Sequence, residues 1–217
     1  MAFQAGGQRP APPPAPATSG AQAYLQDYTA LLEGVPFPSL VVDHRWDVVL
    51  SNGAFRTLFR GAGPHPTAMP GDNFLRFVLF HPDASAVLGE HESSWCLPML
   101  AHFAAALERY GHDPGLQAVR RDIAQDPIME AAYRQGLPHW IRAVGAEAVE
   151  HDGAVRPLHH PDPRWGDTEC RVVIETPRTL EELGYTRLTL VLRERRRTPY
   201  RPARRTAAHL RVVPAPE

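Results

Sequence analysis

The sequence predicts an α+β fold: a single antiparallel sheet with helices packed on one side. Residues 37–59 indicate two short strands that lead directly into a helix, and residues 154–193 contain about three further strand patterns. Between these two groups, apolar residues recur at helical spacing. A single sheet is the economical arrangement, because the two strand groups then share one hydrophobic core.

The first half of the expected domain begins with an amphipathic helix over residues 21–33. Its apolar stripe consists of Tyr24, Leu25, Tyr28, Leu31 and Leu32. A hairpin follows, with strands near residues 40–42 and 46–50. Asn52 is a suitable N-cap for the next helix, in which Phe55, Leu58 and Phe59 recur at i, i+3 and i+4.

Helices are predicted through the middle of the chain. Residues 73–81 form a short one with Asp72 as its N-cap, and Pro98 stands in the first turn of another that runs to about Tyr110. Asp113-Pro114 and Asp126-Pro127 each combine an N-cap with a proline at the first helical position. These two pairs therefore mark definite helix starts.

Three strands are predicted near the end of the domain, over residues 154–160, 171–175 and 187–193. Pro157 has no N–H to donate to a neighbouring strand, so the first of these strands is expected at an edge of the sheet.

Length and composition agree with one domain that carries tails. The chain has 217 residues, 43% of them hydrophobic, and a net charge of −1. All 23 basic residues are arginine, which we interpret as codon bias. The near-neutral charge gives no reason to expect nucleic acid or a membrane as a partner of the whole chain. Without a long apolar stretch or a signal pattern, the expected location is cytoplasmic.

The two ends are expected to lie outside the folded domain, which would then span residues 21–193. Residues 1–20 contain five prolines and no periodic apolar face, which is typical of a disordered leader. Residues 194–217 are basic and broken by prolines, so a disordered tail is expected there. Any contact between its arginines and DNA would be weak and sensitive to salt.

Metal and cofactor sites are not expected. Cys96 and Cys170 belong to no metal or redox spacing, so both are expected to be small core residues. The adjacent His159 and His160 would point to opposite faces of a strand, which disfavours a shared metal ion. The sequence also contains no phosphate-binding or dinucleotide-binding loop.

A hairpin that leads into an amphipathic helix, with an Asn just before that helix, resembles the start of a PAS domain. Several blocks together resemble the ligand-binding domain of MmyB-like transcription regulators, a PAS-like family, and they cover about residues 21–193 in family order. The blocks are the helix 21–33, the hairpin that ends at Asn52, the run Asn73 to Pro82, Trp95, the segment Asp113 to Met129, and His160-Pro161.

The chain departs from the family pattern in two places. Tyr133 stands where the family has Trp, and residues 163–169 look inserted or rearranged. The family's regulators also carry a helix-turn-helix domain ahead of this one, whereas the Pro/Ala-rich leader occupies that place here. Sequence-specific DNA reading by this chain is therefore not expected.

The resemblance implies a pocket between sheet and helices that holds a small lipophilic molecule, such as a fatty acid. The side chains that would line it, unless they are plain core residues, are Phe77, Leu79, Phe80, Trp95, Met99 and Phe103. Arg76 lies among apolar neighbours, so its guanidinium either reaches the surface or binds the carboxylate of the ligand.

The leading hypothesis is a binding or sensor module that takes part in transcription regulation and passes ligand occupancy to a partner. One alternative is an enzyme that uses the same pocket for chemistry on a lipophilic metabolite, with no catalytic residue assigned. Another is a dimerisation module in which helix 21–33 pairs with a second copy of the chain.

Overall fold

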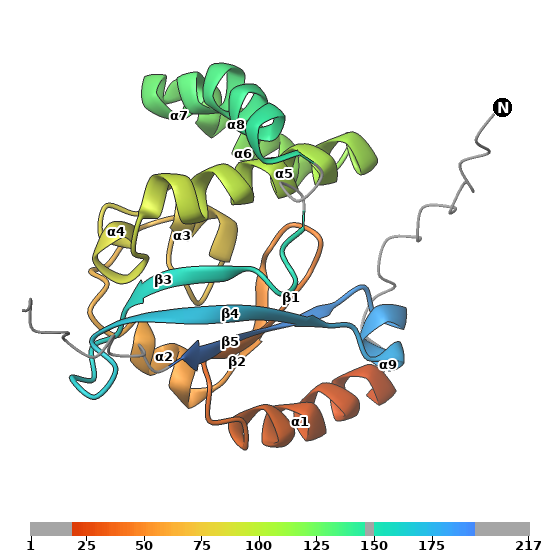
Figure 1. Cartoon of the computed structure of the whole chain (residues 1–217). Helices are drawn as coiled ribbons and strands as arrows, with labels where there is room; N and C mark the ends of the chain where they lie inside the picture. Colours follow the sequence, from red (N-terminus) through yellow and green to blue (C-terminus); the bar gives the residue numbers. More distant parts are fainter. Residues whose placement is uncertain (1–18, 146–149, 194–217) are drawn as a thin grey trace, which may run out of the picture.

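The computed structural model describes residues 19–145 and 150–193, and a five-stranded antiparallel sheet forms its centre (Figure 1). The strands are β1 (Ser39–Val42), β2 (Val48–Ser51), β3 (Val155–His159), β4 (Asp167–Glu175) and β5 (Thr186–Arg193). Their order in the sheet is β2-β1-β5-β4-β3. Pairing of β1 with β5, in which Leu40 lies opposite Leu188, joins the two strand groups. The predicted α+β class with a single antiparallel sheet is confirmed.

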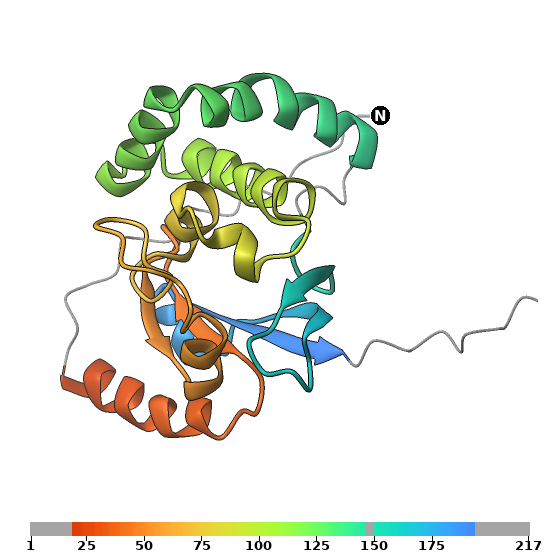
Figure 2. The ribbon, with the colours of Figure 1, turned by 90° about the vertical axis from the view of Figure 1, so that its left-hand side faces the viewer.

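Most helices of the described residues lie over one face of this sheet, with α6, α7 and α8 forming a layer outside α5 (Figures 1 and 2). The helical segments are α1 (Ser19–Glu33), α2 (Gly53–Leu58), α3 (Phe74–Phe80), α4 (Ala84–Val87), η1 (His91–Cys96), α5 (Leu97–Arg109), α6 (Pro114–Gln125), α7 (Pro127–Ala131), η2 (Ala132–Gly136), α8 (Leu137–Val144) and α9 (Arg178–Glu182). The segments η1 and η2 are π-helical turns.

The sheet buries side chains on both faces, whereas the sequence predicts helices on one side only. In β1, Leu40 and Val42 belong to the larger core under α3 to α8, whereas Val41 faces the other way. Tyr28 and Leu32 of α1 pack there with Val41 and with Leu180 of α9. The expectation that all helices pack on one side is therefore wrong for α1 and α9.

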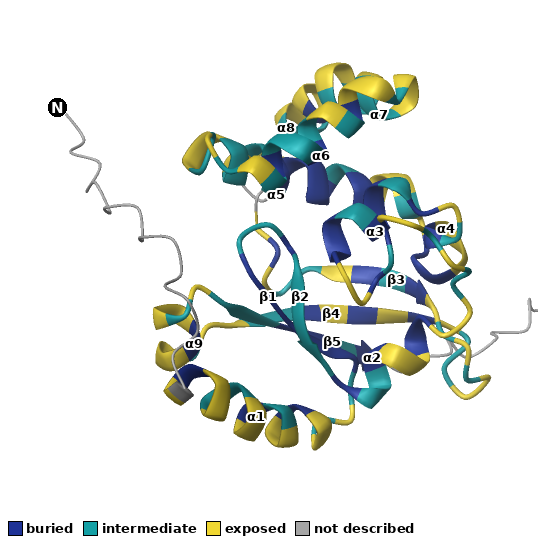
Figure 3. Cartoon of the chain, turned by 180° about the vertical axis from the view of Figure 1, so that it is seen from behind, coloured by how far each residue is buried: buried dark blue, intermediate teal, exposed yellow. Residues whose placement is uncertain are grey.

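Side chains of β4 alternate between the larger core and the exposed face of the strand (Figure 3). Cys170 and Val172 are buried, while Glu169 and Arg171 between and beside them are exposed. The prediction that the cysteines are core residues is confirmed, since Cys96 is also buried. Burial raises the pKa of each thiol to about 12.

Most of the N-caps predicted from the sequence are present in the structure. Asp113 and Asp126 accept hydrogen bonds from the first N–H groups of α6 and α7. Asn73, rather than the preceding Asp72, caps α3. Asn52 caps α2 and also ties three segments together, because its side chain contacts the end of α1, the start of β1 and the first turn of α2.

The hairpin turn is longer than predicted, because β2 begins at Val48 and Trp46 belongs to the turn. The carboxylate of Asp43 fixes this turn by accepting hydrogen bonds from the N–H groups of Arg45 at 2.8 Å and Asp47 at 3.0 Å. Trp46 itself has a φ of 67°, which is unusual for a bulky residue, and its ring is buried.

Strand β3 is an edge strand, as Pro157 predicted, and the chain covers it with the segment between α4 and η1. The carbonyl of Pro157 accepts hydrogen bonds from the N–H of Gly89 and from Nε1 of Trp95, each at 3.0 Å. A Cβ at position 89 would lie 3.0 Å from Cβ of Pro157, which is tighter than an ordinary contact, so this close approach favours glycine.

Residues 1–18 and 194–217, on which the expected leader and tail fall, lie outside the described residues. Among the helices that the structure does describe, none is long and apolar enough to span a bilayer.

Candidate functional site: a pocket between the sheet and helix α5

A pocket of about 380 Å³ lies between the sheet, the β1–β2 turn and helix α5. Its floor on the sheet side consists of Val42, Ile174 and Leu188. Ala105 and Ala106 line it on the side of α5. Small side chains on a helix above a sheet leave room that Leu or Phe would fill. The sequence of α5, with three consecutive alanines at 104–106, is thus one reason why the pocket exists.

The remaining wall of the pocket is aromatic and polar. Trp46 of the hairpin turn and His102 of α5 both line it, and their ring centroids are 5.9 Å apart with the rings nearly perpendicular. Arg109, at the exposed end of α5, also belongs to the lining. An apolar floor with a few polar groups on one side is the usual composition of a small-molecule site.

A second imidazole lies behind this wall. The ring of His151 contacts the ring of His102, at a centroid distance of 4.3 Å, and the ring of Trp46, at 5.6 Å. Burial, with a contribution from the charge of Arg156, lowers the pKa of His102 to about 4. Burial and the same arginine hold the pKa of His151 well below its ordinary value, so both imidazoles are neutral at pH 7.

Arg156 completes this buried group. It lies on β3 and points into the core, where it is only 4% exposed. Its Nη2 donates to Nδ1 of His151 over 2.8 Å, its Nη1 donates to the carbonyl of Ser94, and its guanidinium lies 5.2 Å from the ring of Trp95. Within residues 19–145 and 150–193 it forms no ion pair with a carboxylate. Burial lowers its pKa to about 10, so it still carries a charge at pH 7.

The hydrogen bond from Arg156 defines the tautomer of His151. A guanidinium only donates, so Nδ1 of His151 is the acceptor and the neutral ring carries its proton on Nε2. In the described part of the chain, this Nε2–H has no acceptor, and neither does the Nε–H of Arg156. Nε2 of His102 is likewise buried and without a partner among those residues. His151 and Arg156 therefore each present a donor whose acceptor is not a side chain or carbonyl of the described residues.

A second hollow, a groove of about 970 Å³, lies between the two π-helical turns and the helices next to them. Cys96 of η1, Met129 of α7 and Ala132 of η2 contribute to it. It lies away from the sheet and is bordered by the exposed Ile128. It has no equivalent of the buried arginine and paired imidazoles, although His91 and His139 are at its rim.

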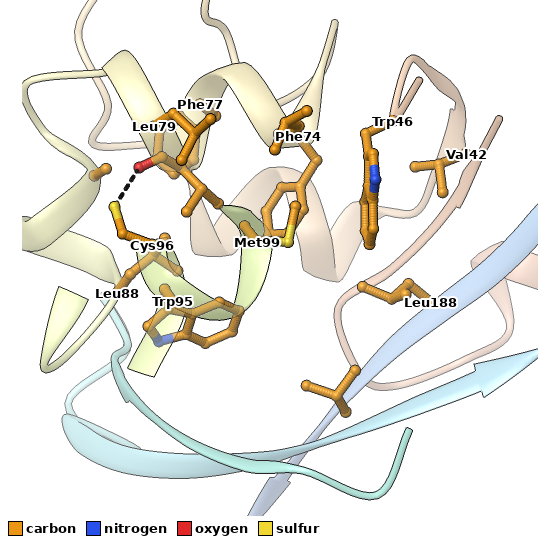
Figure 4. Packing of buried hydrophobic residues seen from close by; sticks show 14 of the residues in the cluster. Val42, Trp46, Phe74, Phe77, Leu79, Leu88, Trp95, Cys96, Met99 and Leu188 are labelled. Carbon is orange, nitrogen blue, oxygen red and sulfur yellow. Dashed lines mark hydrogen bonds between the residues drawn. The ribbon is translucent and has the colours of Figure 1, made fainter. Parts of the chain in front are cut away.

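The apolar residues proposed from the sequence form a dense part of the core (Figure 4). Phe77, Trp95, Met99 and Phe103 are fully buried, Leu79 is buried, and Phe80 packs against them while partly exposed. In Figure 4, Trp46 stands beside Val42 and Leu188, apart from Trp95 and Cys96. None of the six lines the pocket or the groove described above, so their role in binding stays a prediction.

Arg76 lies between α3 and α6, where both terminal nitrogens contact the carboxylate of Asp122, Nη1 at 2.6 Å. Its guanidinium is also 6.0 Å from the ring of Phe80. The side chain is only partly buried and lines neither hollow. A cation and an aromatic ring do lie together here, but the carboxylate that meets the cation belongs to the chain itself.

Sequence reasoning missed His102, His151 and Arg156. One usable signal was present: in β3, Arg156 and Leu158 are two residues apart and therefore share a face, and Leu158 is a core residue. Nothing in the sequence indicated that two histidines so far apart in the chain would contact each other.

The described residues form an α+β domain with a pocket of apolar and polar lining between its sheet and helices. Over residues 26–162, more than half of its length, the chain matches the family described as MmyB-like transcription regulator ligand binding domain. The chain belongs to this family, as the sequence blocks predicted, and membership indicates a small-molecule sensing role. No curated protein matches the chain.

Proposed function

We propose that this domain binds a lipophilic acid of the fatty-acid type in the pocket between the sheet and α5, and that it reports occupancy to a partner in transcription regulation. The observation that supports this most is the combination of an apolar floor, Val42 and Leu188, with the aromatic and polar wall of Trp46 and His102. A ligand that fits both must have an apolar body and a polar end.

The position of the pocket suggests how occupancy is reported. Thr186 and Leu188 of β5 line the pocket, and Arg187 between them points to the opposite face of the sheet. There its Nη1 comes within 3.5 Å of the hydroxyl of Tyr28 on α1. A ligand that shifts β5 therefore acts on α1 through one residue of the same strand.

The partner that α1 would contact remains a proposal. One alternative from the sequence is a homodimer through helix 21–33, but Tyr28 and Leu32 of that stripe pack against the sheet of their own chain. Leu31, with 68% of its surface exposed, is the member of the stripe that stays available to a second copy.

The proposed site is tested by filling the pocket. Ala106→Trp places a large ring in it, whereas Ala132→Trp fills the groove at η2 and serves as the matched control, since both alanines are helical and partly buried. By calorimetric titration, dodecanoic acid should bind the unchanged protein and Ala132→Trp alike. It should bind Ala106→Trp at least about 30-fold more weakly, a loss of the order expected when a ligand-sized space is closed.

Other results for these two variants would assign the ligand to a different place or contradict it. Loss of binding in Ala132→Trp alone would assign the ligand to the groove. Binding that survives both changes would favour the core around Trp95 and Met99 as the binding region, as predicted from the sequence. Absence of binding to the unchanged protein would contradict the lipophilic ligand itself.

The alternative of an enzyme on the same pocket predicts that the bound molecule is chemically changed and released. A cysteine nucleophile is not supported, because burial raises the pKa of both thiols to about 12. The mass of the bound molecule after prolonged incubation distinguishes the two functions, since a sensor leaves it unchanged.

A further inference from the structure

His102 in the wall of the pocket and the buried His151 and Arg156 behind it form a group with more hydrogen-bond donors than acceptors. His151 and Arg156 are 2% and 4% exposed, and each has a nitrogen without a partner in the described parts of the chain. A buried donor without an acceptor is costly, and a buried cation without an anion is more so. This group is therefore suited to a ligand atom that accepts hydrogen bonds and carries negative charge.

We propose that His102, His151 and Arg156 form the subsite that holds the carboxylate of the bound acid, which rests on the function proposed above. His102 lines the pocket and so meets the head of the ligand first. His151 lies directly behind, in contact with the two rings that separate it from the pocket, those of Trp46 and His102. Since the ring centroids of Trp46 and His102 are only 5.9 Å apart, these two rings must move aside for the carboxylate to accept a hydrogen bond from the Nε2–H of His151.

Arg156 acts on the carboxylate through His151. Its Nη2 donates to Nδ1 of that ring, which fixes the proton on Nε2 and polarises the ring, so that Nε2–H becomes a stronger donor. The positive charge of Arg156 also attracts the anion in a region from which water is largely excluded. Arg156 is thus a positioning residue, and His102 and His151 are the groups that contact the ligand.

Other charged groups around the pocket compete less well for this role. Arg109 lines the pocket from the exposed end of α5, where solvent screens its charge. Asp43 also lines the pocket and would repel an acid, but its carboxylate is paired with Arg45 at 3.0 Å. The acid is therefore expected to enter with its carboxylate toward His102 and its chain toward the apolar floor.

The first test compares dodecanoic acid with dodecan-1-ol in calorimetric titrations of the whole chain. Arg156→Met keeps an unbranched apolar stem but removes the charge and the bond to His151, and His151→Phe keeps a ring but removes the donor. Each change should weaken binding of the acid by about 30-fold or more and that of the alcohol by less than about 3-fold, because only the acid uses the charge. Arg76→Met is the matched control, because Arg76 lines neither hollow, and it should leave the ratio of acid to alcohol affinity unchanged.

A second test avoids variants that fail to fold. In the unchanged protein with ¹⁵N-labelled histidine, addition of dodecanoic acid should move the Nε2 and Hε2 resonances of His151 and His102 strongly downfield, and the alcohol should not. If the acid binds while these resonances stay in place, or if Arg156→Met weakens acid and alcohol equally, the proposed subsite is wrong and the pocket itself stands. If neither compound binds to the unchanged protein, both the proposed subsite and the proposed function are wrong.

Discussion

Arg156 and His151 are joined by a hydrogen bond of 2.8 Å inside the core, with the guanidinium as donor and Nδ1 as acceptor. Both side chains are almost fully buried, and no carboxylate of the described residues is paired with the arginine. A stability role alone would be served better by apolar residues of similar volume. We therefore connect the pair with ligand binding in the pocket on the other side of His102 and Trp46.

The buried histidines should make the fold sensitive to mild acid. An imidazole with a lowered pKa binds a proton in the unfolded chain at a pH where the folded protein excludes it. The free energy of unfolding should therefore be highest above the ordinary value of 6.5 and fall as the pH drops toward about 4, the folded-state pKa of His102. His151 contributes with the same sign.

Urea unfolding at pH 6.5 and at about pH 5 measures this effect, because most carboxylates stay ionised over that interval. The pKa values of His91 and His160 are also lowered, so they contribute in the same direction. His102→Gln should show a smaller drop in the urea midpoint between the two pH values than the unchanged protein. An identical drop would mean that His102 does not titrate as described.

Asn52 should be among the most sensitive positions in the fold. Its Nδ2 donates to the carbonyls of Leu32, Val35 and Phe37, and its Oδ1 accepts from two backbone N–H groups. Asn52→Asp keeps the acceptor but removes both donors and buries a charge, so it should lower the free energy of unfolding by about 3 kcal/mol or more. Ser51→Ala, one residue earlier, should change it by less than about 1 kcal/mol. Urea titration of both variants checks the contrast.

The close approach of Gly89 to Pro157 predicts a steric effect on the cover of the sheet edge. The Cβ of Gly89→Ala would lie 3.0 Å from Cβ of Pro157 and 3.2 Å from its carbonyl carbon. The segment must then move away from β3, at an expected cost of about 1–3 kcal/mol. Gly61→Ala meets no atom within 4 Å and should be close to neutral. Equal midpoints in thermal unfolding for the two variants would contradict this packing.

Arg76 distinguishes the sequence-based anchor from the one that the structure favours. Because Arg76 is paired with Asp122 and only partly buried, Arg76→Ala should cost no more than about 1 kcal/mol of stability. It should also leave the preference for dodecanoic acid over dodecan-1-ol unchanged. A selective loss of acid binding in this variant would restore Arg76 as the residue that holds the carboxylate.

The sequence predicted best the features that depend on a few neighbouring residues. Asp113-Pro114 and Asp126-Pro127 fix helix starts through a side-chain acceptor and a preset φ, and both effects are local. Pro157 marked an edge strand because a missing N–H is a property of one residue.

Features that depend on distant contacts were not predictable. The stripe of α1 showed that one side of the helix is buried, but periodicity does not say against which face of the sheet. The sequence predicted Trp46 in a strand. In the structure it belongs to the turn, which the carboxylate of Asp43 fixes by accepting a hydrogen bond from the N–H of Asp47. The group of His102, His151 and Arg156 forms only when β3, α5 and the segment before β3 meet in space.

The most direct test of the account is native mass spectrometry of the protein equilibrated with an excess of dodecanoic acid, then exchanged into volatile buffer. We expect one added acid molecule per chain on the unchanged protein and on Ala132→Trp, and none on Ala106→Trp. Retention of the acid by Ala106→Trp, or its absence from the unchanged protein, would contradict the claim that the pocket between the sheet and α5 holds a lipophilic acid.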